Sequence, residues 1–129
     1  MEKVTLNEEY TTYLESVNKI GEYEALTEKD YTILCGSQPI ERPYFLPGIN
    51  GVPSDSKYTT GSVLYVLKES TSAMDALRKS IYLGGDVDSI ASICTGIMSG
   101  IHGVESLPNY MLENVEGVAY IEELSLIHI

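Results

Sequence analysis

A chain of 129 residues that is 43% hydrophobic and 21% charged has the composition of one small globular domain or of part of a larger one. Its net charge of −11, from 8 basic and 19 acidic residues, argues against nucleic acid as a partner, because phosphate binding needs clustered Lys and Arg. No apolar run reaches the roughly 18 residues that a membrane span needs, so we expect no membrane partner.

Two cysteines, Cys35 and Cys94, lie in apolar surroundings and lack the spacing of a metal site. We expect both to be buried free thiols, as in proteins of reducing compartments. No signal peptide opens the chain, so the predicted localisation is cytoplasmic.

The first third of the chain predicts two helices. Thr5 and Glu8 form a capping box before a helical stripe of apolar residues. A shorter helix is expected from about Glu28 to Leu34, capped by Thr27 and ending near Gly36. The residues of the first stripe are Tyr10, Tyr13, Leu14, Val17 and Ile20.

Residues 37–57 hold four of the five prolines and cannot form a helix. We interpret them as a long ordered loop, and loops of this length are uncommon unless they are functional or disordered. Tyr44, Phe45 and Leu46 indicate that this loop packs against other parts of the protein.

The next segment predicts two helices, Thr59 to Leu67 and Ser72 to Tyr82, the second capped by Ser72 with Asp75. One face of the second helix is expected to pack, with Met74 beside it. The predicted packing residues are Ala73, Leu77, Ser80 and Ile81.

A helix from about Ser89 to His102 follows, and it is apolar or small on every side. This pattern predicts a buried helix with neighbours on several sides. His102 is expected to serve only as a helix-terminal residue. Pro108 predicts the start of another helix that ends near Gly117, and an amphipathic piece follows it. No segment shows the alternation of a strand, so the fold class is all-α.

Two acidic residues stand at the start of the apolar helix, in Gly84-Gly85-Asp86-Val87-Asp88-Ser89. One Asp would suffice to cap the helix, whereas two carboxylates beside a buried helix repel each other. A hard divalent cation removes this conflict, because Mg²⁺ prefers oxygen ligands. Asp86, Asp88 and the Ser89 hydroxyl supply three oxygens from one turn, and the glycines allow a tight backbone approach.

Other Asp-x-Asp sites fit less well. An EF-hand loop needs Asp or Asn and then Gly where Ile90 and Ala91 stand. A haloacid-dehalogenase-type motif needs an apolar strand before its first Asp, and nucleotide-sugar glycosyltransferases need α/β surroundings. On spacing alone, a metal site and a charged helix-capping turn remain equally supported.

The wider sequence around this motif, AMDALRKSIYLGGDVDSIASICTGIMSGIHGVESLPNYMLENVEG, resembles the C-terminal part of the ADP-ribosylglycohydrolase family. The family shows an Ala-rich helix, a G-G-D-x-D-[TS] motif, a small-residue helix that ends in Gly, and a Leu-Pro before a final helix. The resemblance covers about residues 58 to 117 and implies an all-α, orthogonal multi-helix bundle. The matching residues are Gly84, Gly85, Asp86, Asp88, Ser89, Ala91, Gly96, Gly100, Gly103 and Pro108.

The resemblance implies a site with two Mg²⁺ ions that hydrolyses an ADP-ribosyl bond in an ADP-ribosylated protein or a small ADP-ribose conjugate. Asp86, Asp88 and Ser89 correspond to metal ligands of the family. Gly85, Gly61 and Ser62 correspond to its substrate side. No catalytic acid or base can be assigned.

Two departures from the family pattern limit these expectations. The other metal ligands come from a T-D-D-like motif, and the nearest string in this chain, Thr27 to Asp30, contains Lys and is explained by capping. Thr60 to Val63 lacks the aromatic residue of a Gly-aromatic-Val turn. Tyr58 and Tyr65 could replace it, although core packing is the expected role of both.

We therefore expect residues 1–123 to be a partial family-like domain that is inactive alone. Residues 124–129 resemble a translated sequencing adapter and are expected to be a non-native tail, so His128 carries no functional weight. Two alternatives remain: a non-catalytic module that binds ADP-ribose or metal, and a helical interaction protein whose aspartates only cap. A fragment should expose an apolar face that a free-standing domain would cover.

Overall fold

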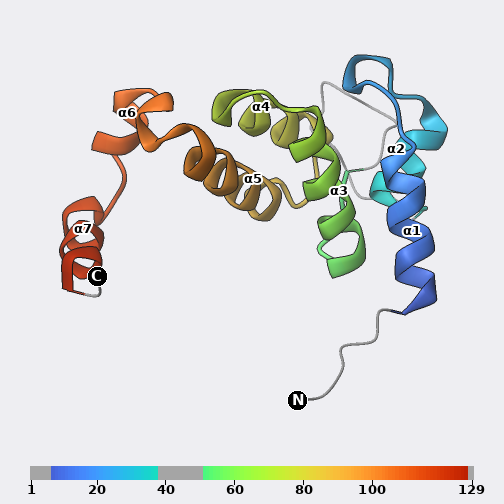
Figure 1. Cartoon of the computed structure of the whole chain (residues 1–129), viewed down its shortest axis with the longest axis horizontal. Helices are drawn as coiled ribbons and strands as arrows, with labels where there is room; N and C mark the ends of the chain where they lie inside the picture. The colour runs from blue at the N-terminus through green and yellow to red at the C-terminus, as the bar shows by residue number, and fades with distance from the viewer. Residues whose placement is uncertain (1–6, 38–50, 128–129) are drawn as a thin grey trace.

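The computed structural model describes residues 7–37 and 51–127, and helices make up most of them (Figure 1). No strand occurs in these two ranges, where the one extended pairing is an isolated parallel bridge between Val52 and Gly85. The all-α prediction is therefore confirmed. Short 3₁₀ turns cover Tyr23–Ala25 and Val104–Ser106. The α-helices are α1 (Glu8–Asn18), α2 (Glu28–Cys35), α3 (Ser56–Glu69), α4 (Ala73–Leu83), α5 (Val87–His102), α6 (Asn109–Glu113) and α7 (Val118–Ile127).

The two N-terminal helices begin at short polar caps. The Asn7 side chain accepts the Glu9 N–H at 2.9 Å, so Asn7 caps α1. Thr5 of the predicted capping box lies outside the described residues. At α2, Thr27 and Asp30 form the reciprocal capping box that accounts for this string without a metal.

Helix α3 begins earlier than the sequence predicts. Asp55 caps it by accepting the Lys57 N–H at 2.9 Å, so the last residues of the proline-rich segment already belong to the helix. The prolines end at Pro53, and nothing after that residue prevents helical backbone. Residues 38–50, with the aromatic residues expected to pack, lie outside the described ranges.

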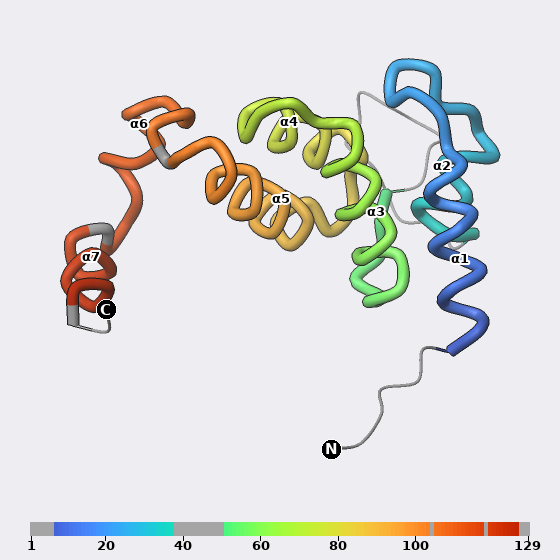
Figure 2. The backbone as a smooth tube through the Cα atoms, viewed as in Figure 1, coloured from blue at the N-terminus to red at the C-terminus, as the bar shows by residue number. Residues whose placement is uncertain are grey.

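The core forms where α3 meets α1, α2, α4 and α5, and Figure 2 shows α3 between α1 and α5. Tyr65 is fully buried, and its hydroxyl donates to the Gly21 carbonyl at 2.6 Å. Burial and nearby carboxylates raise the pKa of Tyr65, so the phenol stays protonated. The Lys68 ammonium donates to the carbonyl of Asn18, the last residue of α1, at 2.8 Å and so caps the C-terminus of that helix.

Helix α4 buries a slightly different face from the predicted one. Ser72 caps it through the Asp75 N–H, as predicted. Ile81, however, is 45% exposed, because the packed side rotates toward Leu83 at the end of the helix. The buried residues of α4 are Ala73, Ala76, Ser80 and Leu83.

Helix α5 is packed on one side only. Its packed face consists of Ile90, Cys94 and Met98, which are buried. Ile93, Ile97 and Ile101 are 44%, 45% and 67% exposed, so the prediction of a helix buried on several sides is wrong. After Asp88, the sequence of α5 has no acidic residue, Lys or Arg to mark an exposed side, and the described part of the chain provides no second layer to cover it.

The C-terminal helices extend away from this core in Figures 1 and 2. Pro108 stands at the N-cap of α6 rather than inside it, and α6 ends at Glu113, earlier than predicted. Gly117 has φ +76° and separates α6 from α7. No helix within the described ranges is long and apolar enough to cross a membrane.

Candidate metal-binding turn at the start of helix α5

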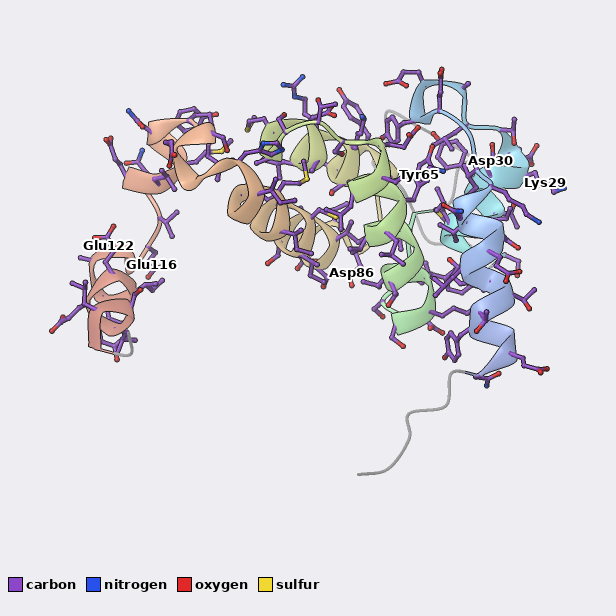
Figure 3. The ribbon with its side chains drawn as sticks, in the orientation of Figure 1. Lys29, Asp30, Tyr65, Asp86, Glu116 and Glu122 are labelled. Carbon is purple, nitrogen blue, oxygen red and sulfur yellow. The ribbon has the colours of Figure 1, made fainter. Side chains whose placement is uncertain are left out.

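The turn between α4 and α5 depends on two consecutive glycines. Gly84 has φ +78° and Gly85 has φ +74°, a region that side chains other than Gly rarely adopt. They reverse the chain so that Asp86 becomes the N-cap of α5, with φ −75° and ψ 59°. This local geometry brings both aspartates to the end of α5 near α3, where Figure 3 labels Asp86.

The three predicted ligand residues lie together in this turn. The Ser89 hydroxyl donates to Asp86 Oδ1 at 3.1 Å, and the Ser89 N–H donates to Asp88 Oδ1 at 3.0 Å. The pKa of the Asp88 carboxyl lies below its ordinary value because of a hydrogen bond with Asp86 and, next, the Ser89 N–H. Asp88 is exposed, whereas Asp86 and Ser89 are half-buried.

The Asp86 side chain does not do what a capping residue normally does. Asn7, Thr27, Asp55 and Ser72 each accept an N–H from the first turn of their helices, whereas Asp86 makes no such hydrogen bond. The two salt bridges found among the described residues, Lys57–Glu9 and Lys79–Asp75, do not involve this turn. Capping and ion pairing therefore do not account for the Asp86 carboxylate.

A segment far away in the sequence holds the turn in place. The Val52 N–H donates to the Gly84 carbonyl at 3.0 Å, and the Val52 carbonyl accepts the Asp86 N–H at 2.8 Å. Gly51 and Val52 are both buried. The sequence did not predict this contact, because residues so far apart in the chain share no local pattern. The one sequence feature that could have indicated a close approach of main chain was the glycine at position 51.

The other predicted substrate residues lie elsewhere, on the packed side of α3. A Cβ on Gly61 would lie 2.5 Å from the Tyr13 hydroxyl, and the Ser62 hydroxyl donates to the Leu34 carbonyl at 3.2 Å. Tyr58 packs edge to face on Tyr13, with ring centroids 5.6 Å apart. Tyr58 and Tyr65 thus have the expected packing roles, and the substrate role of Gly61 and Ser62 stays a prediction.

The remaining titratable residues add little to this turn. Figure 3 places Lys29 and Asp30 on α2, well away from Asp86. Cys35 and Cys94 form no disulfide and are buried, as predicted, and burial raises the pKa of the Cys94 thiol. Among the residues that the structure describes, no three His, Cys, Asp or Glu side chains gather closely enough to hold a metal ion.

Comparison with known proteins identifies the relationship. The sequence model of ADP-ribosylglycohydrolase matches residues 7–128. The chain belongs to the ADP-ribosylglycohydrolase family. Neither a search of curated proteins nor a search of solved structures finds a match.

Family membership indicates an ADP-ribosylglycohydrolase-like hydrolase. This family is known to use metal ions. The donor atoms of Asp86, Asp88 and Ser89 are all oxygens, which fits a hard cation such as Mg²⁺. A cation of this kind normally takes more protein or substrate oxygens than one turn can supply. The turn therefore fits part of a metal site.

Proposed function

We propose that this chain contributes the Asp86, Asp88 and Ser89 part of a magnesium site in a hydrolase that cleaves ADP-ribosyl bonds. The observations that carry the proposal are that Asp86, Asp88 and Ser89 share one turn, that the Ser89 hydroxyl donates to the Asp86 carboxylate, and that the Asp86 side chain makes no capping hydrogen bond. Family membership supports the reaction class and an ADP-ribosylated protein or small ADP-ribose conjugate as the substrate.

In the proposed site, each residue has a defined task. Two bound Mg²⁺ ions would orient the ribose hydroxyls and polarise the bond at the anomeric carbon. Asp86 and Asp88 would hold the cations through their carboxylates, and Ser89 would add its hydroxyl oxygen while keeping Asp86 oriented. Gly85 would contribute only main-chain atoms on the substrate side, because the space where its Cβ would lie is occupied by the main chain of Val52.

We further propose that residues 1–123 form a partial family domain without hydrolase activity of its own, and that 124–129 are a non-native tail. In the described ranges, no three acidic, His or Cys side chains are grouped so that they could hold a metal ion, which supports an incomplete site. The exposed isoleucines of α5 support the need for further helices, since an apolar face of this kind is usually covered by a partner.

The metal part of the proposal can be tested by ¹⁵N NMR of the whole chain during a Mg²⁺ titration. We expect weak binding that shifts the amide signals of Asp86 to Ile90 selectively, and loss of those shifts in Asp86→Asn and Asp88→Asn. Asp75→Asn is the matched control, because Asp75 also stands in the first turn of a helix but pairs with Lys79 at 2.9 Å. Equal shifts in wild type and Asp88→Asn would leave only the alternative of a capping turn.

The activity part needs an assay for released ADP-ribose. We expect no release by the isolated chain from an ADP-ribosylated protein, because positioning groups and an acid or base are missing. In a longer reading frame that joins these residues to a T-D-D-like motif, activity should appear and Asp88→Ala should remove most of it. Turnover by the isolated chain that survives Asp86→Ala and Asp88→Ala would place the chemistry elsewhere.

A further inference from the structure

We propose that Gly51 and Val52 are positioning residues for the metal-binding turn, an inference that rests on the proposed function. These residues do not offer a ligand atom to the cation. They hold the main chain of Gly84, Gly85 and Asp86 so that the Asp86 carboxylate can face a cation instead of capping α5.

The contact is a main-chain clamp with hydrogen bonds on both sides of Gly85. The Val52 N–H donates to the Gly84 carbonyl at 3.0 Å, and the Asp86 N–H donates to the Val52 carbonyl at 2.8 Å. These bonds make the parallel bridge between Val52 and Gly85. A single residue of the distant segment thus fixes the peptide groups on either side of the glycine that precedes Asp86.

The approach of the two segments requires glycine in both. A Cβ on Gly51 would lie 2.3 Å from the Gly85 main-chain nitrogen, and a Cβ on Gly85 would lie 2.1 Å from the Val52 carbonyl oxygen. Real Cβ atoms do not approach main-chain atoms so closely, and main chain cannot move aside as a flexible side chain can. An alanine at position 51 must therefore push the turn away.

The clamp also explains why Asp86 differs from the other caps. At α3, the Asp55 carboxylate accepts the Lys57 N–H. At α5, the turn is already held through the Asp86 main chain, and the Asp86 carboxylate accepts the Ser89 hydroxyl instead. Removing the clamp should let the Asp86 carboxylate turn toward the N–H groups in the first turn of α5, where the positive end of the helix favours it. Capping would then compete with cation binding.

The clamp is anchored in the core. Val52 is fully buried, and the adjacent Pro53 carbonyl accepts the Thr59 hydroxyl of α3 at 3.2 Å. The same short segment leads into the Asp55 cap of α3. The position of the turn at α5 is therefore tied to the start of α3 rather than to α4 and α5 alone.

The test uses Mn²⁺ as the probe and the whole chain in ¹⁵N NMR, where bound Mn²⁺ broadens nearby amide signals. In wild type we expect selective broadening of Asp86, Asp88 and Ser89. Gly51→Ala should raise the Mn²⁺ concentration at half broadening by about tenfold, as is typical for residues that orient metal ligands. Amide hydrogen exchange at Asp86 should also speed up more than at Cys94, which lies further along α5.

Two matched variants separate positioning from general stability. Val52 and Val66 are both fully buried, and Val66 lies in α3 outside the clamp. Val52→Ala and Val66→Ala remove the same atoms, and both should lower the melting temperature. Only Val52→Ala removes the buried side chain that anchors the clamp main chain in the core, so only this variant should raise the Mn²⁺ midpoint. This pair decides the question if Gly51→Ala does not fold.

Equal Mn²⁺ midpoints in Val52→Ala and Val66→Ala, or a wild-type midpoint in folded Gly51→Ala, would overturn the positioning role alone. Wild type without selective broadening would instead overturn the proposed metal function and this inference with it. The two failures are thus distinguishable in one set of spectra.

Discussion

The two sides of helix α5 have nearly the same hydrophobicity and opposite surroundings. The packed face, formed by Ile90, Cys94 and Met98, lies against α3 and α4. The open face consists of three isoleucines with two glycines between them, and a Cβ on either glycine would meet no atom within 4 Å. The open-face residues are Ile93, Gly96, Ile97, Gly100 and Ile101.

This comparison shows that the burial of an apolar side chain depends on the element that packs against it as much as on the residue type. An isoleucine contributes hydrophobic stabilisation only when another element removes it from water. The open face runs along α5 away from the proposed metal-binding turn. Substitutions on the packed face, on the open face and on helix α4 should therefore change the free energy of unfolding by different amounts. The largest difference is expected between Ile90 and Ile93.

The largest effect should come from one substitution made on each face. Ile90→Ala should lower the free energy of unfolding by roughly 2–5 kcal/mol, because Ile90 is fully buried and its loss leaves a cavity. Ile93→Ala should change it by less than about 1 kcal/mol, because Ile93 already contacts water. Urea unfolding followed by circular dichroism measures both values. Similar losses for both variants would mean that the open face is covered in solution.

A smaller effect should come from the helix that covers the packed face. Asp75 of α4 pairs with Lys79 at 2.9 Å, and the Lys79 ammonium also donates to the Glu69 carbonyl at the end of α3. Desolvation opposes ionisation of Asp75, but the Lys79 and Thr71 hydrogen bonds outweigh it and lower its pKa. Asp75 therefore adds stability above its unfolded pKa of about 3.9, and this is lost as the pH falls through the lower folded value.

Thermal melts of wild type and Asp75→Asn between neutral and acidic pH test this linkage. Near neutral pH the wild type should be more stable by about 1 kcal/mol, and the difference should shrink in acid. A difference that stays constant over the acidic range would show that the ion pair does not stabilise the packing of α4. Glu113→Gln in α6 serves as a control away from this pair.

The smallest effect should distinguish the open face directly. Gly96→Ala and Gly100→Ala should each raise the free energy of unfolding by roughly 0.5–1 kcal/mol, because Ala is the better helix former and the new Cβ has open space. Differential scanning calorimetry at several protein concentrations measures this change. A lower melting temperature in either variant would show that another helix approaches the glycines closely.

The sequence alone determined the local features of this protein. The Thr27 and Ser72 caps, the end of α5 at His102 and the all-α class depend on interactions within a few residues, which patterns report directly. The motif from Gly84 to Ser89 could also be recognised in the sequence, because its glycines and its proposed oxygen ligands are neighbours in the chain. The same motif pointed to the family that the comparison then confirmed.

Tertiary structure decided which apolar residues are buried and what holds the proposed metal-binding turn. Ile90 and Ile93 look alike in sequence, and only the positions of α3 and α4 separate them. Gly51 and Val52 meet Gly85 across more than thirty residues of chain, through main-chain groups that every sequence carries. Main-chain hydrogen bonds can form between residues of any type, so the sequence does not predict this clamp and only the tertiary structure reveals it.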